Sequence, residues 1–440
     1  MSEKPEWLTV NANGQATIHP ALVVDQLEEI LTGKLFYYQS SWWFWKERIW
    51  EIIEEHRVKT GIRDLLVSHP ISKFQTRLSV IKDILEQLRL VLIPEGDFLG
   101  FDQNHDLIVF KNGTLDLKKD EFAKIHRPED FKSIMLEFDF DESKNCTRWL
   151  KFLDEIDLDQ DTQTRIQEWV GYLLIPTAKL QKCLYLIGEG ANGKSVFLNT
   201  IRSMLGYKNV SSLEMAELFD RFKIEKLRGK LVNIATDCET SKSMDSRFKK
   251  IVSGEPIVSE KKFQDSFEFI PYARLLFSAN DFVHTRDKSH GFFRRFDTVR
   301  FPRVFKPSEQ DFDLEKTLLE ELPGIFNWAL KGLRRLESND WIMTPSSSME
   351  EAHSEFKRGL NPLHDFVDEK CSFGPDNSVK AEDFRQYYFQ WSRDNRHRAL
   401  PATTLGKELL RLKPQIEKHR IMTDKKRQIY YKGIALVSEK

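Results

Sequence analysis

The sequence has few cysteines and no long apolar run. Its four cysteines, Cys146, Cys183, Cys238 and Cys371, lie far apart without CxxC spacing or a partnering pair of histidines, so neither a disulfide framework nor a zinc site is indicated. No stretch approaches the roughly 18 uncharged apolar residues of a membrane helix, and the N-terminal MSEKPEWLTV lacks the basic start and apolar run of a signal peptide. We therefore expect a cytoplasmic protein with no membrane partner.

The sequence also lacks an excess of either charge. Lys and Arg number 67 against 68 Asp and Glu, so composition alone does not carry the basic signature of a nucleic-acid-binding protein. With 40% hydrophobic and 12% aromatic residues, the chain is too rich in bulky side chains to be largely disordered. Its 440 residues, at roughly 150 per domain, predict two or three domains.

An α+β domain is expected over residues 1–145. Apolar residues at helical spacing predict helices over Val24–Leu31 and Arg77–Val91. Two aromatic runs, LFYYQ and WWFWK, flank a pair of serines and predict a tight hairpin. These rings could stack on nucleic-acid bases, but no basic residues are interleaved, so a packed hairpin is the preferred interpretation. A second hairpin is predicted at Asn112-Gly113.

Strand-like and helical segments alternate over residues 146–337, which predicts an α/β fold with helices flanking a sheet. A helical stretch at 147–176 comes first. The predicted strands that follow it are Lys182–Ile187, Lys230–Thr236, Ala273–Ala279 and Phe296–Phe301. A linker of turn-forming residues, with little to bury, then leads into a C-terminal domain over residues 350–440.

Residues 188–195 read GEGANGKS, the GxxxxGK[ST] pattern of a phosphate-binding loop. Glycines let the backbone turn its N–H groups toward phosphate oxygens, Lys194 supplies a charge for the β and γ phosphates, and Ser195 supplies a hydroxyl for Mg2+. The alternative is a glycine turn that happens to precede Lys-Ser, but it leaves the flanking strand and helix unexplained. The expected ATP-binding residues are Gly188, Glu189, Gly190, Ala191, Asn192, Gly193, Lys194, Ser195 and Val196.

Two further strands end in polar residues that suit ATP hydrolysis. LVNIATDCE leads into Asp237 and Glu239, which could share the metal ion and the attacking water, although either could instead cap the next helix. ARLLFSAN ends in Asn280, whose amide could bind the water or the γ-phosphate, although Asn is also an ordinary turn residue. We expect Ser195 and Asp237 to hold Mg2+.

The segment GFFRRF places Arg294 and Arg295 in an aromatic run. Either guanidinium could stabilise the charge of the transferring phosphate, including that of a neighbouring subunit, and the alternative is a surface arginine pair.

Between the second and third strands, IVSEKKFQDSFEF predicts two short strands with Lys261, Lys262 and Gln264 near their turn. Lysine attracts phosphate without demanding sequence, so this hairpin could hold a DNA backbone, and a charged hairpin on a solvated edge is the alternative.

These motifs give the chain a resemblance to a known family. The segments that carry it are the phosphate loop with its internal Asn192, LRGKLVNIATD, SGEPI, FSAN and DKSHGFFRRF. In these segments the chain resembles a superfamily 3 AAA+ helicase, and more narrowly the helicase portion of poxvirus, phage and plasmid type primase-helicases. The chain also resembles that family's N-terminal helicase-associated region, in the segments KNGTLDL, HRPED, TRWLKFLDEI and EWVGYLLIP. The resemblance implies a homo-hexameric ring that hydrolyses ATP and translocates on single-stranded and forked DNA, usually 3′ to 5′.

In the terms of that family, Lys194 and Ser195 belong to the phosphate loop, Asp237 and Glu239 to the second motif and Asn280 to the sensor. Arg294 or Arg295 would be the trans-acting finger, and Lys261 and Lys262 fall on the DNA-contacting hairpin.

Two departures from the family pattern matter. The second motif often has Glu where Asp237 stands, which leaves open whether Asp237 or Glu239 activates water. Many relatives also carry an upstream primase module. Asp139 and Asp141 have an acid-x-acid arrangement, but no further acid and Ser-x-His set follows, so we expect priming by a separate primase or initiator protein.

The C-terminal domain is locally basic. Residues 391–432 contain 12 Lys and Arg against 4 Asp and Glu, an excess of 8 positive charges. Predicted helices over Ala381–Asp394 and Thr404–Leu412, followed by two strands, suggest a winged helix, and the resemblance also implies one. Such a domain could bind duplex DNA, or dock a protein or act as a lid in a ring.

The expected function is an ATP-dependent replication helicase of a phage, plasmid or mobile element. One alternative is an AAA+ initiator or switch that binds DNA without unwinding it, although a switch needs no lysine-tipped hairpin. A second alternative is a scaffold with an inactive nucleotide site.

Overall fold

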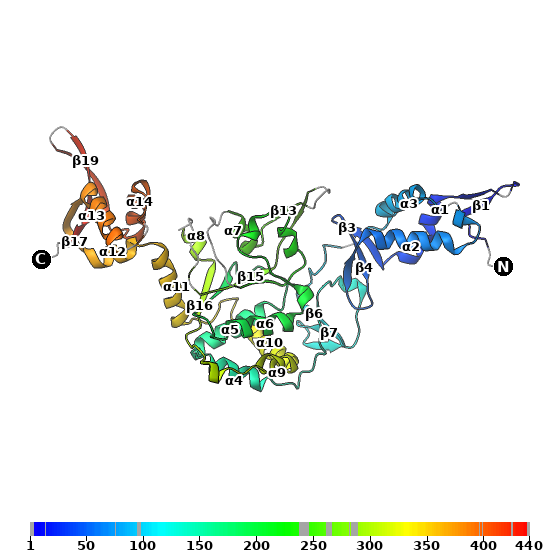
Figure 1. The fold of residues 1–440 in the computed structure, drawn as a ribbon, viewed down its shortest axis with the longest axis horizontal. Helices are drawn as coiled ribbons and strands as arrows, with labels where there is room; N and C mark the ends of the chain where they lie inside the picture. The colour runs from blue at the N-terminus through cyan, green and yellow to red at the C-terminus, as the bar shows by residue number, and fades with distance from the viewer. Residues whose placement is uncertain are drawn as a thin grey trace.

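The computed structural model describes residues 4–437 except 14, 75, 95–97, 237–245, 261–265, 281, 283–288, 396, 398 and 424–425. Figure 1 shows an N-terminal part and a C-terminal part at opposite ends of a central block. Every helix of the described residues is too short or too polar to span a bilayer.

The N-terminal part confirms the predicted helices and the aromatic hairpin. Its helices are α1 (Pro20–Leu31), α2 (Glu55–Ser68) and α3 (Leu78–Val91), and its strands are β1 (Leu8–Val10), β2 (Ala16–Ile18), β3 (Leu35–Tyr38), β4 (Ser41–Trp45) and β5 (Trp50–Ile53). The turn between β3 and β4 is made by Gln39 and Ser40, both at positive φ. Strand β4 lies between β3 and β5.

The aromatic residues of this hairpin are packed, as predicted. Trp43 stacks on Phe101 with ring centroids 4.0 Å apart, and Phe36 stacks on Trp50 at 4.7 Å. All four rings are buried in one cluster. They are therefore core rather than an open platform for bases.

A second small sheet contains β6 (Leu107–Phe110), β7 (Gly113–Asp116), β8 (Glu121–Ala123) and β9 (Met135–Leu136). The hairpin predicted at Asn112-Gly113 is present, but its turn residues are Lys111 and Asn112, because Phe110 pairs with Gly113. Asn112 bonds the backbone of Phe140 through both side-chain atoms, at 2.9 and 3.0 Å. This sheet packs into the core of the central block, so that core crosses residue 145. The boundaries between the three predicted domains remain predictions.

The central block is built on a five-stranded parallel sheet, in the order β11-β12-β15-β10-β16. The strands are β10 (Cys183–Ile187), β11 (Val210–Ser211), β12 (Val232–Ala235), β15 (Arg274–Ala279) and β16 (Phe296–Arg300), and a separate hairpin pairs β13 (Ile257–Ser259) with β14 (Phe267–Phe269). The helices are α4 (Thr147–Glu155), α5 (Gln160–Tyr172), α6 (Lys194–Leu205), α7 (Ser246–Ser253), α8 (His290–Phe293), α9 (Leu314–Glu320) and α10 (Leu322–Ser338). All four predicted strands are confirmed.

Both faces of the parallel sheet are buried, which explains why its strands read as apolar runs. In β10, Leu184 and Leu186 face one core while Cys183, Tyr185 and Ile187 face the other. This alternation follows from the two-residue period of a strand.

The linker expected to have little to bury, which carries Asn339, Pro345 and the serines 346–348, is packed at its end instead. Ser346 is buried, accepts a hydrogen bond from the Met349 amide at the start of α11 (Ser347–Leu360), and lies 2.7 Å from the Thr162 hydroxyl. Met349 and Phe356 of α11 extend the two central cores. The serines therefore begin a helix that covers the central block.

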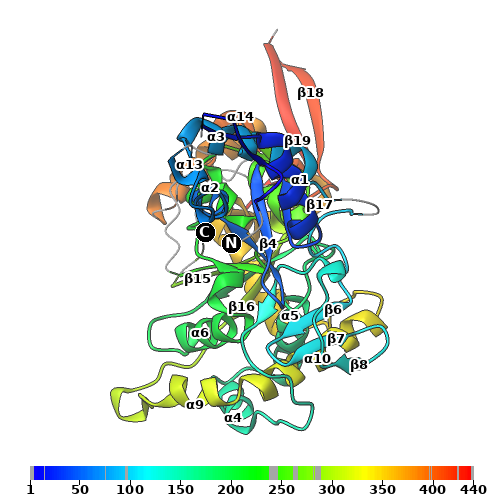
Figure 2. The same ribbon diagram turned by 90° about the vertical axis from the view of Figure 1, so that its right-hand side faces the viewer.

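The C-terminal part has its own core and a three-stranded antiparallel sheet in the order β17-β19-β18. Its elements are α12 (Leu363–Lys370), β17 (Cys371–Lys380), α13 (Ala381–Asp394), α14 (Ala402–Leu412), β18 (Glu417–Thr423) and β19 (Lys426–Leu436). Figure 2 shows the β18–β19 hairpin extending away from the rest of the chain. The two helices and two strands predicted here are confirmed, whereas β17 was not foreseen because Gly374 and Pro375 interrupt it.

Candidate nucleotide site

The parallel register brings the predicted phosphate loop and Asn280 to one edge of the sheet. Ile187, the last residue of β10, pairs with Ala279 of β15 and with Arg300 of β16. The loop and Asn280 follow directly, so both lie at the carboxyl edge, and Asn280 is exposed. Ligands of open parallel sheets bind at this edge.

The two acids of the second motif lie outside the described residues. The strand that leads to Asp237 and Glu239 is β12, whose last residue Ala235 pairs with Phe277 of β15. Strand β15 therefore separates β12 from β10. Among the described residues, no group of three His, Cys, Asp or Glu side chains is arranged to hold a metal ion.

Glycines at both ends of the loop are required by close contacts. A Cβ on Gly188 would lie 2.3 Å from Asn192 Nδ2 and 2.6 Å from the Phe301 oxygen. Gly193 precedes α6 with a φ of 87°, and a Cβ there would lie 2.9 Å from Ile156. Gly190, by contrast, has nothing within 4 Å of its Cβ position.

The loop folds around the Lys194 ammonium group. Lys194 is buried, and its Nζ donates to the Gly188 oxygen, to the Glu189 oxygen at 3.3 Å and to Asn192 Oδ1 at 3.0 Å. Asn192 Nδ2 is also buried, and no described atom accepts a hydrogen bond from it. A positive charge and an unsatisfied donor at the positive end of helix α6 fit a phosphate anion.

The remaining loop residues face outward or pack lightly. The exposed ones are Glu189, Gly190, Ala191 and Ser195, and Val196 is half-buried. Ser195 lies in the first turn of α6, beside Lys194, where its hydroxyl is free to reach a metal ion held near phosphates. The Ala191 oxygen accepts a hydrogen bond from the Phe305 amide at 2.7 Å, which ties the loop to the chain that follows β16.

A cavity of about 250 Å³ lies beside the loop. The cavity adjoins the loop on two sides. Ile156 lies close to the Cβ position of Gly193, and the residue after it, Asp157, lines the cavity. Phe301 lies close to the Cβ position of Gly188, and the residue after it, Pro302, also lines the cavity. Its other polar lining residues include Asp159, Arg300, Glu351 and Glu355. Sequence reasoning missed this cavity because its walls come from α5, β16 and α11, which are far apart along the chain.

The structure separates the two candidate arginines. Arg294 is exposed, whereas Arg295 is buried and donates to the Gly291 oxygen and, at 2.9 Å, to Ser253 Oγ. Both precede β16, whose first residue Phe296 pairs with Cys183. They therefore lie at the amino edge, and the five residue steps from Cys183 to Gly188, at roughly 3.3 Å per strand residue, place the phosphate loop about 17 Å beyond the start of β16.

The predicted hairpin before β15 is present as strands β13 and β14, in which Ser259 pairs with Phe267. Its tip, with Lys261, Lys262 and Gln264, lies outside the described residues. Contact between these residues and DNA stays a prediction.

Two family models match parts of the chain. One is described as "D5 N terminal like" and matches residues 29–158. The other is described as a family of unknown function, DUF5906, and matches residues 186–295, from the end of β10 to the candidate arginines.

The curated relatives are viral proteins with helicase names. "Putative helicase 184R" of Invertebrate iridescent virus 6 is 21% identical over 372 residues, covering 69% of this chain and 37% of the relative. "Putative helicase L207/L206" of Acanthamoeba polyphaga mimivirus is 26% identical over 251 residues, covering 52% and 25%. "Putative helicase 121R" of Invertebrate iridescent virus 3 is 22% identical over 253 residues, covering 54% and 27%. The chain thus spans between a quarter and two fifths of their lengths.

Among solved structures, the apo C-terminal region of NrS-1 has a similar fold. Its A form aligns with a TM-score of 0.54 at 12% identity, covering 94% of this chain and 99% of that one. A second apo structure of this region gives a TM-score of 0.52 at 10% identity, with the same coverage. The D5-type match, the viral relatives and this shared fold confirm the predicted resemblance to the phage and viral primase-helicase family.

The loop geometry predicts different effects for two glycine substitutions. Gly188→Ala should abolish nucleotide binding, because its Cβ collides with the Phe301 carbonyl and with Asn192, whereas Gly190→Ala should bind normally because its Cβ meets open space. Titration with a fluorescent ATP analogue checks this, with the Tm measured in parallel. Equal affinities of the two variants would contradict the described loop.

Proposed function

We propose that this chain is the helicase portion of a replication protein, a superfamily 3 AAA+ enzyme. As a homo-hexamer it couples ATP hydrolysis to translocation along single-stranded DNA, 3′ to 5′, and so unwinds forked DNA. The observation that carries the proposal is the phosphate loop folded around Lys194 at the carboxyl edge of a parallel sheet, with Asn280 beside it. ATP is the substrate class that suits a GxxxxGK[ST] loop followed by a helix.

Each site residue has a proposed role in hydrolysis. Lys194 would bind the β and γ phosphates, Ser195 and Asp237 would hold Mg2+, and Asn280 would orient the attacking water. The metal ion, when bound, neutralises charge that develops on the phosphates. Asp237 and Glu239 remain alternatives for activation of that water.

The cavity beside the loop is the proposed nucleoside site. Its position next to Gly188 and Gly193 is where a ribose and base attached to loop-bound phosphates would extend. Carboxylates such as those of Asp157 and Glu351 can accept hydrogen bonds from ribose hydroxyls and from an exocyclic amine.

Arg294 is the proposed arginine finger. It is exposed, while Arg295 is held inside its own subunit by hydrogen bonds to Gly291 and Ser253. Because both lie at the edge opposite their own loop, a finger here would act on the nucleotide of a neighbouring subunit.

The proposed DNA contacts are the tip of the β13–β14 hairpin, with Lys261, Lys262 and Gln264, and the basic C-terminal part. The order helix, strand, helix, helix, strand, strand from α12 to β19 supports a winged helix. Its helix α14 has Thr403, Thr404 and Lys407 exposed at its first turns, which suits contact with duplex DNA.

The main alternative is an initiator or switch that hydrolyses ATP without unwinding. Wild type and the variants Lys194→Ala and Lys261→Ala/Lys262→Ala should be compared on duplexes with 3′ and 5′ tails. We expect the wild type to unwind the 3′-tailed duplex, Lys194→Ala to lose ATP turnover by about 100-fold or more, and the double variant to hydrolyse ATP without unwinding. ATP hydrolysis by the wild type without opening of any tailed duplex would favour the alternative.

The finger assignment can be tested by mixing two inactive variants. Arg294→Ala alone should lose about 1,000-fold in turnover. Lys194→Ala alone should lose about 100-fold or more. Rings mixed from the two should recover part of the activity, because a Lys194→Ala subunit still offers its Arg294 to the intact loop of an Arg294→Ala neighbour. Steady-state ATPase of the mixtures measures this, with Arg295→Ala, which should mainly lower the Tm, as the comparison. Mixtures that stay inactive would refute the assignment.

Filling the cavity tests the nucleoside site. Glu351→Trp places a ring in the cavity and should raise the KM for ATP about tenfold, equivalent to about 1.4 kcal/mol. Glu350→Trp, at the preceding residue of α11 and outside the cavity lining, should leave the KM unchanged. Steady-state kinetics measure the KM for ATP of both variants. An unaltered KM in both would exclude this cavity as the nucleoside site.

A further inference from the structure

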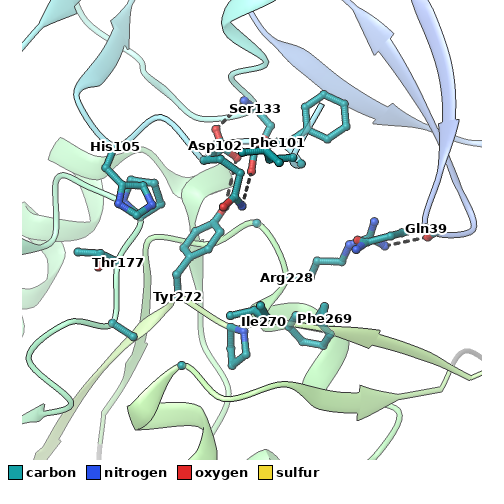
Figure 3. A pocket seen from close by; sticks show the side chains of 18 of the residues that line it. Gln39, Phe101, Asp102, His105, Ser133, Thr177, Arg228, Phe269, Ile270 and Tyr272 are labelled. Atoms are coloured by element: carbon teal, nitrogen blue, oxygen red, sulfur yellow. Dashed lines mark hydrogen bonds between the residues drawn. The ribbon is translucent and has the colours of Figure 1, made fainter. Parts of the chain in front are cut away.

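A second cavity, of about 500 Å³, lies at the amino edge of the central sheet, opposite the phosphate loop. Figure 3 shows that its walls come from both the N-terminal part and the central block. The first contributes Gln39 of the β3–β4 turn and Asp102, and the second contributes Arg228 and Tyr272, which precede strands β12 and β15. Neither the proposed ATP site nor the proposed DNA contacts use these residues.

Arg228 connects two hairpins that belong to different parts of the chain. Its Nη1 donates to the Gln39 oxygen at 3.3 Å and to Ser41 Oγ at 3.4 Å, both in the β3–β4 hairpin. Its guanidinium also lies over the rings of Trp43 in β4, at 5.8 Å, and of Phe267 in β14, at 5.3 Å. Arg228 is half-buried, and the desolvation of its guanidinium lowers the pKa of this group.

Tyr272 makes the second connection. Its hydroxyl donates to Asp102 Oδ2 at 3.2 Å, and Asp102 also accepts hydrogen bonds from the Ser133 amide, at 2.8 Å, and from the Ser133 hydroxyl (Figure 3). Burial, reinforced by the charge of Asp102, raises the pKa of Tyr272 well above its ordinary value. The hydroxyl therefore remains protonated and keeps donating to Asp102 at neutral pH.

These contacts lie at the amino ends of the two strands that lead to the proposed hydrolysis residues. Arg228 comes shortly before β12, which leads to Asp237, and Tyr272 comes shortly before β15, which leads to Asn280. Tyr272 also follows β14 of the proposed DNA hairpin by three residues. Because β12 and β15 pair along their length, with Val232 opposite Arg274, a shift at their amino ends is passed to their carboxyl ends.

We infer that Arg228, Tyr272 and Asp102 form a coupling joint, through which the N-terminal part fixes the β13–β14 hairpin relative to strands β12 and β15. When bound DNA moves the hairpin, the movement is thereby transmitted to the proposed ATP site. Without the joint, the hairpin would move relative to the strands and the ATP site would not respond. Arg228 and Tyr272 are positioning residues, since neither touches nucleotide. This inference rests on the proposed helicase function.

The test compares ATP turnover with and without single-stranded DNA. Tyr272→Phe removes only the hydroxyl that binds Asp102, and Arg228→Gln removes the cation between the two hairpins. We expect both variants to keep basal kcat, ATP KM and DNA affinity within about twofold of wild type, while stimulation of ATPase by oligo-dT falls about fivefold or more and unwinding falls with it. The matched controls, Tyr207→Phe and Arg63→Gln, replace exposed side chains and should behave as wild type.

The outcomes separate the two claims. If DNA stimulates the ATPase activity of the wild type and of the Tyr272→Phe and Arg228→Gln variants equally, the coupling joint is overturned and the proposed function stays intact. A wild type whose ATPase does not respond to DNA would overturn the proposed function and, with it, the joint. If Arg228→Gln lowers the Tm too far for kinetics, Tyr272→Phe alone decides, because it changes a single hydrogen bond.

Discussion

Parallel pairing of β10 with β15 and β16 is the constraint on which the rest of the structure depends. It brings the ends of strands that are far apart in the sequence to one edge, so that the phosphate loop after Ile187 and Asn280 after Ala279 become neighbours. The same pairing fixes what lies opposite, at the amino edge, where Arg294 and Arg295 precede β16. This register therefore places the proposed nucleotide site at one edge and the contacts with the N-terminal part at the opposite edge.

Different kinds of interaction occur at the two edges of the parallel sheet. At the carboxyl edge, backbone groups and the Lys194 ammonium form a small polar cradle whose dimensions are set by glycine contacts. At the amino edge, a half-buried arginine between aromatic rings and a tyrosine bound to Asp102 join the N-terminal part to the sheet. Stiff strands between the edges give a direct physical route from the proposed DNA-contacting hairpin to the proposed ATP site.

Local signals predicted most of this architecture. Apolar runs such as Lys182–Ile187 are strands because both faces of a parallel sheet are buried, and GEGANGKS carries its own signature. The cavity beside the loop and the coupling joint were not predictable. Their residues meet only in the folded chain, as Asp102 and Tyr272 do across 170 residues of sequence. The predicted linker before residue 350 proved to be packed for a related reason, since a turn-forming residue such as Ser346 can also cap a helix.

The central claim is that nucleotide binds at the carboxyl edge around Lys194. A structure of the assembled chain with Mg2+ and a non-hydrolysable ATP analogue tests this most directly. The terminal phosphates should lie within hydrogen-bond distance of Lys194 Nζ, and the nucleoside should lie in the cavity beside Asp157 and Glu351. Arg294 of an adjacent copy should lie at the γ-phosphate. An analogue bound elsewhere, with Lys194 still bonded to the carbonyl groups of its own loop, would contradict it.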